Sequence, residues 1–337
     1  MASLGPLWPR IHLINRLELV AGSELRTLGL ANILSGHADV HVWATDIPDP
    51  RLSAAVPIKL IEPRKGRFPR SGTFVFVGVY YPLGRWLHLV WPSRRIIILN
   101  TPQPDLFAQF ERQTARTLRP APCEVVYATD LLRPLLGRTG MVQKSPVDVR
   151  AFQPPAAPRA NGGGPFRVGR LSRDVPEKFH ADDPALFAAL AAQGVDVRLM
   201  GGACLGLPPS PRIVVTAPGS APAPAFLHAL DCFVYRTAST WLDTFPRVVI
   251  EAMACGLPVV AGRHGGHAEH IAHGVNGLLF DSGDEAQAHI LRLRGDPELC
   301  AYLGRNARQT VERMYSGDYE RGIIEFYTGR PAPSHTL

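Results

Sequence analysis

Cysteine is scarce in this sequence, and the five cysteines are scattered along the chain. None of them forms a CxxC pair, so we expect neither a disulfide framework nor a zinc site, but small buried thiols in a reducing cytosol. Long hydrophobic runs are also missing, because no uncharged apolar stretch approaches the ~20 residues that span a bilayer. The N-terminal MASLGPLWPR lacks a basic segment followed by a long apolar run, so no signal peptide is expected. These absences predict a cytoplasmic location.

Two further absences exclude classes of protein. No segment repeats at the periods typical of solenoids or propellers. No GxGxxG motif follows the first apolar run of either half, which argues against a Rossmann dehydrogenase, and the Gly201-Gly202 pair alone does not change this. The 31 glycines and 32 prolines fall mostly between apolar runs. They therefore separate structural elements and do not form a low-complexity tract.

The length and the apolar pattern indicate two domains. The chain has 337 residues, 46% of them apolar and 19% charged, enough for two hydrophobic cores. Short apolar runs alternate with segments of helical spacing in both halves, which predicts α/β architecture with two doubly wound parallel sheets facing across a cleft. Residues 153–165 are rich in Pro, Ala and Gly and mark the predicted boundary. We expect an N-terminal domain over 1–152, a C-terminal domain over 153–312, and a helix within 313–337 as a candidate to pack back on the first domain.

The positive charge is concentrated in the N-terminal half. Residues 1–150 contain 19 Lys and Arg against 11 Asp and Glu, which accounts for all of the excess. The stretches RKGRFPR (64–70) and GRWLHLVWPSRR (84–95) place cations beside large aromatic residues, and in the second Arg85, Arg94 and Arg95 flank Trp86 and Trp91. Such patches suit an anionic membrane surface on the inner face or a lipid-linked acceptor. A solvated basic face with Trp86 and Trp91 partly in the core would give the same pattern. Nucleic acid is not expected, because no binding motif accompanies the charge.

Two cations lie at the start of the second half. Arg170 ends the first predicted strand of that half, and Lys178 follows in the adjoining loop. In open parallel sheets ligands bind outside the carboxyl ends of the strands. An arginine fork and a lysine point charge at that place can neutralise a diphosphate. Two solvated surface cations are the alternative explanation.

The segment from Asp243 to Gly266 carries two carboxylates and a double glycine. Asp243 lies in a loop, Glu251 on the following helix, and Gly265 and Gly266 after a buried strand. A carboxylate such as Glu251 can accept both hydroxyls of a ribose, although a helix-surface glutamate is the alternative. Asp243 would face sugar hydroxyls, and the glycines would admit backbone N–H groups to phosphate or sugar, unless they form a plain turn. The order of these features along successive strand ends favours a nucleotide-sugar site.

FRVGRLSRDVPEK and the run from Asp243 to Phe280 resemble the donor domain of retaining GT-B glycosyltransferases of family 4, over most of residues 166–315. The resemblance implies a GT-B fold and a nucleotide-diphosphate sugar as donor, with no cofactor and no metal, and a glycan, lipid-linked or small-molecule acceptor. It implies that Arg170 and Lys178 bind the diphosphate, Glu251 the ribose and Asp243 the transferred sugar. The implied donor-binding set is Arg170, Lys178, Asp243, Phe245, Glu251, Gly265 and Gly266, with Arg170, Lys178 and Asp243 as candidate catalytic residues. Gly22 and Asn100 are weaker candidates on the acceptor side.

The resemblance has three departures. Asp243 replaces the usual glutamate, and Pro246 stands where glycine is common and has no N–H to donate. The family often has a histidine after a strand of the first domain, where this chain has Asn100 and Thr101. His12, His37, His41 and His88 are weak substitutes. Because the cations and the second carboxylate are retained, we favour a transferase with an unusual donor or acceptor.

The implied reaction is retaining transfer through an oxocarbenium-like transition state, in which the two cations stabilise the departing diphosphate. The main alternative is a catalytically silent GT-B protein that binds a nucleotide sugar or supports a partner transferase. A GT-B sugar epimerase fits the donor-domain motifs less well.

Overall fold

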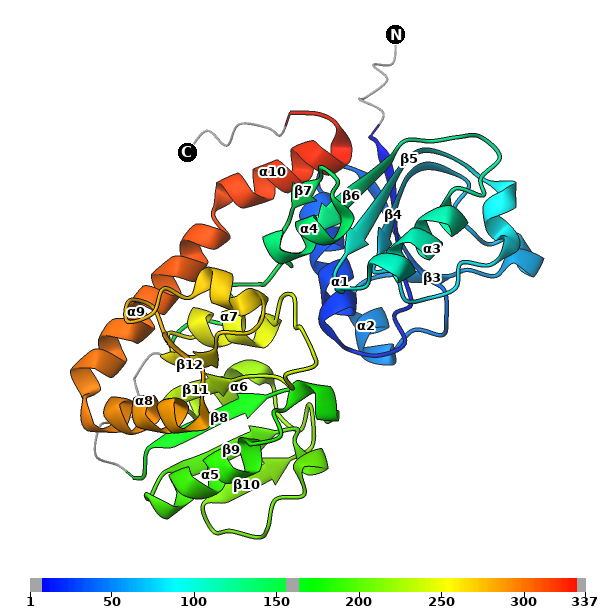
Figure 1. The fold of residues 1–337 in the computed structure, drawn as a ribbon. Helices are drawn as coiled ribbons and strands as arrows, with labels where there is room; N and C mark the ends of the chain where they lie inside the picture. Colours follow the sequence, from blue (N-terminus) through cyan, green and yellow to red (C-terminus); the bar gives the residue numbers. More distant parts are fainter. Residues whose placement is uncertain (1–7, 156–163, 332–337) are drawn as a thin grey trace. The chain divides into compact units, whose positions relative to one another are not determined.

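The computed structural model describes residues 8–155 and 164–331. The chain forms two compact units (Figure 1): unit 1 contains the residues up to Pro146 and those from Ser316 onward, and unit 2 is Val147–Tyr315. Part of the boundary expected at 153–165, residues 156–163, lies outside the described residues. Within the described ranges, no helix combines the length and the apolar character needed to cross a bilayer.

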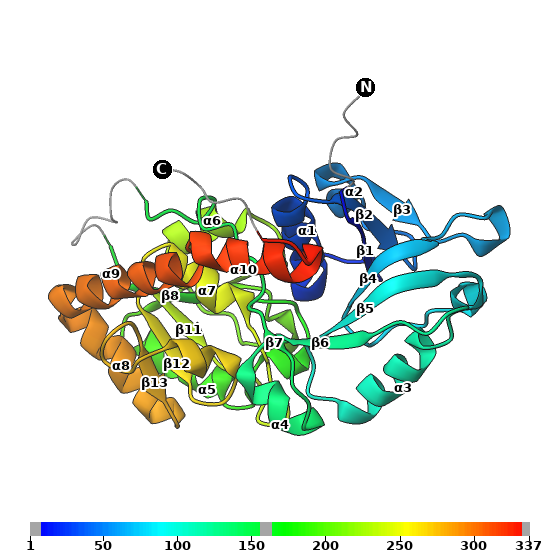
Figure 2. The same ribbon diagram turned by 90° about the horizontal axis from the view of Figure 1, so that it is seen from above.

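Unit 1 is a seven-stranded parallel sheet in the order β3-β2-β1-β4-β5-β6-β7. Its strands are β1 (Arg10–Asn15), β2 (Asp39–Ala44), β3 (Ile58–Leu60), β4 (Ser71–Val77), β5 (Trp91–Leu99), β6 (Cys123–Tyr127) and β7 (Met141–Val142). Its helices are α1 (Gly22–Leu34), α2 (Pro50–Ala55), α3 (Pro104–Thr114), α4 (Arg133–Leu136) and α10 (Gly317–Thr328). The last helix runs beside α1 (Figure 2) and buries Ile323 and Tyr327 in the core of this unit.

Unit 2 is a six-stranded parallel sheet in the order β10-β9-β8-β11-β12-β13. Its strands are β8 (Arg167–Leu171), β9 (Asp196–Met200), β10 (Ile213–Thr216), β11 (Cys232–Tyr235), β12 (Val259–Gly262) and β13 (Leu278–Phe280). Its helices are α5 (Asp183–Ala192), α6 (Ala223–His228), α7 (Arg247–Ala254), α8 (Gly283–Gly295) and α9 (Pro297–Met314). The strand order reverses between β8 and β11, so the carboxyl ends of these two strands form the switch point where such sheets bind ligands.

Burial on both faces explains why these sequences form parallel strands. The run Ile96–Leu99 of β5 has no exposed surface, and the four residues of β11 are buried as well. Each fully buried large apolar side chain contributes about 1.5–3 kcal/mol relative to an exposed one. Helices cover such strands, and α3 does so with Phe107 and Phe110 on one face and charged residues on the other. The two predicted doubly wound parallel sheets are therefore confirmed.

Helix α1 begins at Gly22 with Ala21 at the N-cap, and the Ser23 hydroxyl accepts a hydrogen bond from Asn15 Nδ2 (2.9 Å). One local expectation is wrong, and it concerns the cysteines. All five thiols are free, but Cys204 is exposed and is not one of the buried thiols that we expected.

The basic stretch of residues 84–95 has two kinds of arginine. Arg95 is buried and donates to the Ala121 carbonyl (2.8 Å) and to the Thr114 hydroxyl (3.0 Å). Arg94 pairs with the Glu124 carboxylate. Arg85, by contrast, is exposed. Two of the three cations thus hold the fold of unit 1 together and are not part of a free basic surface.

His12, a weak catalytic candidate, is a core residue of unit 1. Its Nε2 donates to the Ser71 carbonyl (2.9 Å), and its Nδ1 accepts from the Trp43 indole (2.9 Å). His12 is 3% exposed, and its ring stacks on the His41 ring at 5.2 Å. Burial lowers the pKa of His12 from 6.5 to about 4, against the opposing effect of the Ser71 hydrogen bond. Both ring nitrogens are used in the neutral form, so the fold requires an uncharged imidazole.

We expect the stability of unit 1 to fall as the pH drops from 6.5 towards about 4. In that range the unfolded chain binds a proton at His12 that the folded chain excludes, which costs up to about 1.4 kcal/mol per pH unit. Urea unfolding followed by tryptophan fluorescence at several pH values measures the slope. His12→Gln should flatten it, and His88→Gln, at an exposed position, is the matched control. An unchanged slope in His12→Gln would contradict this role.

Candidate functional site

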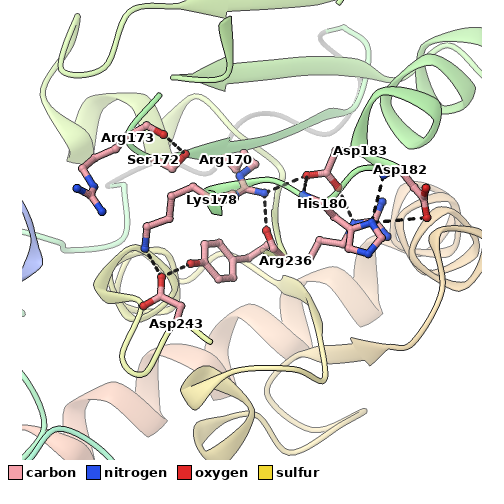
Figure 3. A network of polar contacts seen from close by, with 10 residues as sticks. Arg170, Ser172, Arg173, Lys178, His180, Asp182, Asp183, Arg236 and Asp243 are labelled. Carbon is pink, nitrogen blue, oxygen red and sulfur yellow. Dashed lines mark hydrogen bonds and ion pairs between the residues drawn. The ribbon is translucent and has the colours of Figure 1, made fainter. Parts of the chain in front are cut away.

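The candidate site lies at the carboxyl ends of β8 and β11. Lys178 ends a short 3-10 turn (Pro176–Lys178) after β8, and Asp243 lies in the loop between β11 and α7. The Lys178 ammonium donates to Asp243 Oδ2, and the Tyr235 hydroxyl donates to the same oxygen (2.6 Å). Figure 3 shows Lys178 reaching across to Asp243. The loop and the strand end are therefore connected through one carboxylate.

Arg170 lies beneath this pair and is almost completely buried. Its guanidinium donates through Nη1 to the Arg236 carbonyl (2.8 Å) and through Nη2 to the Lys178 carbonyl. It also faces the rings of Phe179 (4.4 Å) and Tyr235 (5.0 Å). Burial lowers the pKa of Arg170, and the nearby Asp183 and Tyr235 oppose that shift. Arg170 is thus neither a solvated surface cation nor an open fork, and it holds the backbone of Lys178 from below.

Asp183, the first residue of α5, compensates the buried charge. Its carboxylate accepts from Arg236 Nε (2.5 Å), from Arg170 Nη1 (3.4 Å) and from the His180 backbone N–H (3.1 Å) (Figure 3). The Asp183 side chain is 2% exposed and that of Arg170 is 1% exposed. Buried charges persist only when they are paired and hydrogen-bonded, and here one anion serves two cations.

The Asp243 carboxylate is ionised at neutral pH. Burial raises the pKa of this group, but Lys178 and the Tyr235 hydroxyl lower it by more, so that it lies below its ordinary value. Tyr235 responds in the opposite sense, because burial and the negative Asp243 raise its pKa well above the usual range. The hydrogen bond between them therefore joins a phenol donor to a charged acceptor.

The double glycine packs against the Asp243 loop. A Cβ on Gly266 would lie 1.7 Å from the Thr244 carbonyl oxygen, so no larger residue fits there. Gly265 has φ +132°, and a Cβ on it would lie 2.8 Å from the His267 ring. The Gly266 N–H already donates to the Asp243 carbonyl (2.8 Å). Packing against backbone thus requires Gly266, and the left-handed backbone conformation favours glycine at 265.

Glu251 and Phe245 have other partners. Glu251, in the second turn of α7, is buried and pairs with Arg247 at 3.4 Å. Burial raises the pKa of Glu251, although Arg247 opposes the shift. The Phe245 ring faces His270 at 5.7 Å. Pro246 occupies the N-cap of α7, where its missing N–H removes no hydrogen bond within the helix.

The expected site residues of unit 2 thus have two sets of contacts. A shared network contains Arg170, Lys178, Asp243, Gly265 and Gly266, whereas Glu251 contacts Arg247 and the Phe245 ring contacts His270. Gly22 and Asn100 belong to unit 1, at the start of α1 and directly after β5.

Sequence reasoning missed three residues of the network: Asp183, Tyr235 and Arg236. Tyr235 and Arg236 follow each other at the end of β11, next to the switch point, and that position was the available signal. Asp183 gave no such signal, because it opens a helix and its role depends on two arginines brought to it by the fold.

Comparison with known proteins gives matches in unit 2 and in the fold. Residues 213–310 match the family described as glycosyl transferases group 1. The N-acetyl-alpha-D-glucosaminyl L-malate synthase of Bacillus anthracis is 36% identical over 78 residues, 23% of this chain and 20% of that protein. A D-inositol 3-phosphate glycosyltransferase of Saccharomonospora viridis is 42% identical over 102 residues, 28% of this chain and 23% of that protein. The chain thus spans about a quarter or less of the length of these relatives.

The whole fold is similar to that of a solved protein. HepE of Anabaena, crystallised in complex with UDP, superposes with a TM-score of 0.73 over 95% of this chain and 100% of that one, at 18% identity. This likeness establishes the GT-B fold with its two Rossmann-like units.

We expect Asp183→Ala to destabilise unit 2 strongly. Removing the carboxylate leaves two buried guanidinium groups without their counter-ion, which typically costs about 3–5 kcal/mol. Asp182→Ala is the matched control, because the neighbouring Asp182 side chain is 70% exposed and its ion pair with His180 is worth about 0–1 kcal/mol. Chemical denaturation of both variants measures the difference, and similar unfolding free energies would refute the compensating role of Asp183.

Proposed function

We propose that this chain is a retaining glycosyltransferase, because residues 213–310 match glycosyl transferases group 1 and the chain has a GT-B fold. It would transfer a sugar from a nucleotide-diphosphate donor to a glycan, a lipid-linked molecule or a small molecule. The observation that supports this proposal is the pairing of Lys178 with Asp243 at the switch point of unit 2. A cation and a carboxylate placed there suit the two ends of a sugar diphosphate.

In the proposed reaction, Lys178 neutralises the departing diphosphate while positive charge develops on the sugar. The Arg170 guanidinium donates to the backbone carbonyl of Lys178. We therefore assign direct diphosphate contact to Lys178 and a supporting role to Arg170. The Asp243 carboxylate accepts a hydrogen bond from a hydroxyl of the transferred sugar. Lys178 takes up phosphate charge in this scheme, which assigns no role to a metal. Glu251 would bind the ribose by exchanging its Arg247 partner for two hydroxyl groups.

UDP-glucose is the first donor to test, because HepE has been solved with UDP and with UDP-glucose. The ring of Phe245 and the Gly265 turn would border the donor, and Gly22 and Asn100 would contact the acceptor. A binding protein without turnover would show a thermal shift with UDP but no release of UDP from UDP-glucose.

Lys178→Ala should lower kcat/KM for donor turnover by about 10²–10³-fold, the usual cost of losing one transition-state donor. The fold should persist, because Lys178 lies in a short turn outside the sheet. The Tyr235 hydroxyl also still donates to Asp243 in this variant. UDP release from UDP-glucose, with and without an acceptor panel, provides the measurement. Lys65→Ala, which removes a largely exposed lysine paired with Glu62 in unit 1, is the control. Turnover equal to wild type in Lys178→Ala would count against the assignment.

We also propose that unit 1 contacts an anionic membrane surface. Three exposed apolar residues belong to neighbouring segments: Leu89 is 53% exposed, Trp91 42% and Leu118 60%. Backbone hydrogen bonds of 2.8 Å join Trp91 to Arg70 and Leu118 to Val90. Exposed arginines accompany this patch, namely Arg70, Arg85, Arg116 and Arg119. Apolar groups amid cations suit the boundary between lipid headgroups and acyl chains.

Vesicle flotation tests the membrane proposal. We expect the protein to bind vesicles in which about one third of the lipid is anionic, and we expect added salt to weaken this binding. Vesicles of neutral phosphatidylcholine should bind little protein. Trp91→Ala should weaken binding by roughly 10- to 100-fold, because it removes roughly 1.5–3 kcal/mol of apolar burial. Leu135→Ser, at an exposed position of α4, is the matched control. Equal binding by both variants would contradict a role for the patch.

A further inference from the structure

The position of the Asp243 carboxylate depends on its partners. The residue lies in the irregular segment between β11 and α7, so regular secondary structure does not fix its side chain. Oδ2 receives both the Tyr235 hydroxyl and the Lys178 ammonium. Within the part of the chain that the structure describes, Oδ1 receives no hydrogen bond and is the oxygen left for a ligand.

The two donors differ in rigidity. Lys178 reaches Asp243 through a flexible four-carbon side chain, and its charge is the part that a diphosphate would attract. Tyr235 is the last residue of β11 and is 1% exposed. Its ring packs on the Arg170 guanidinium (5.0 Å) and makes a T-shaped contact with the His267 ring (5.2 Å). A phenol ring packed in this way has no second position from which to donate.

We propose that Tyr235 is the positioning residue for Asp243: it holds Oδ2 when Lys178 turns to the diphosphate and so keeps Oδ1 directed at the transferred sugar. This inference rests on the proposed function of the site. An aspartate reaches one methylene less far than a glutamate, so a small rotation of its carboxylate removes contact with a sugar hydroxyl. Reactions in such sites lose about 10²-fold when a group is misplaced by 1 Å.

Tyr235→Phe removes the hydroxyl and keeps the ring. We expect kcat with UDP-glucose to fall at least tenfold, while KM for the donor changes little, because the diphosphate contact is retained. The acid limb of the kcat/KM profile should move to higher pH, because the Tyr235 hydrogen bond is one of the contacts that lower the pKa of Asp243. A role in packing alone would leave that limb in place.

Tyr327→Phe is the matched control. Tyr327 is also a 1% exposed tyrosine, and its hydroxyl donates to Gln143 Oε1 at 2.6 Å, but it belongs to α10 in unit 1. The same chemical change there should leave the acid limb unmoved. Wild-type kcat and an unshifted limb in Tyr235→Phe would overturn the proposal.

A carbon-13 NMR titration of the ligand-free protein separates this proposal from the proposed function. The pKa of the Asp243 carboxyl should rise in Tyr235→Phe and stay unchanged in Tyr327→Phe. If it rises while the wild-type protein turns over no nucleotide sugar, the transferase assignment fails and the positioning contact stands. If it does not rise, the positioning role fails whatever the activity.

Discussion

The site in unit 2 depends on one buried carboxylate, that of Asp183. It binds Arg170 on β8 and Arg236 after β11, and so it ties together the two strands at which the sheet order reverses. Both guanidinium groups would be very unfavourable in this interior without it. With it, Arg170 can stay inside and use its remaining donors on the carbonyls of Lys178 and Arg236. The buried Asp183 carboxylate thus holds Arg170, and Arg170 in turn holds the backbone of Lys178.

The upper part of the network follows from this foundation. Tyr235 packs on the Arg170 guanidinium and directs its hydroxyl at Asp243, and Lys178 approaches the same oxygen from the other strand end. Each member thus has a protein partner in the ligand-free state. A donor diphosphate would have to compete with Asp243 for Lys178, so binding and rearrangement of this ion pair are coupled.

Much of the fold could be predicted from the sequence, because parallel strands buried on both faces leave continuous apolar runs such as Ile96–Leu99 and CFVY in β11. The strand-end positions of Arg170, Lys178 and Asp243 followed from the same alternation. Whether a strand-end cation points outward or inward could not be predicted, since it depends on Asp183 from a separate helix. Arg95 and Leu118 show the same limit in unit 1: one is bonded inside and the other is exposed beside β5 for reasons that only tertiary contacts reveal.

The absence of a side chain at Gly266 has a consequence for the exchange of parts between related proteins. The Thr244 carbonyl fills the space that any substituent would need, and the Gly266 amide holds the Asp243 carbonyl. The carboxylate loop and the glycine turn are thus complementary surfaces that must be inherited together. A chimera that imports one of them from a homologue without the other would join mismatched halves, so recombination is constrained to keep both on a single fragment.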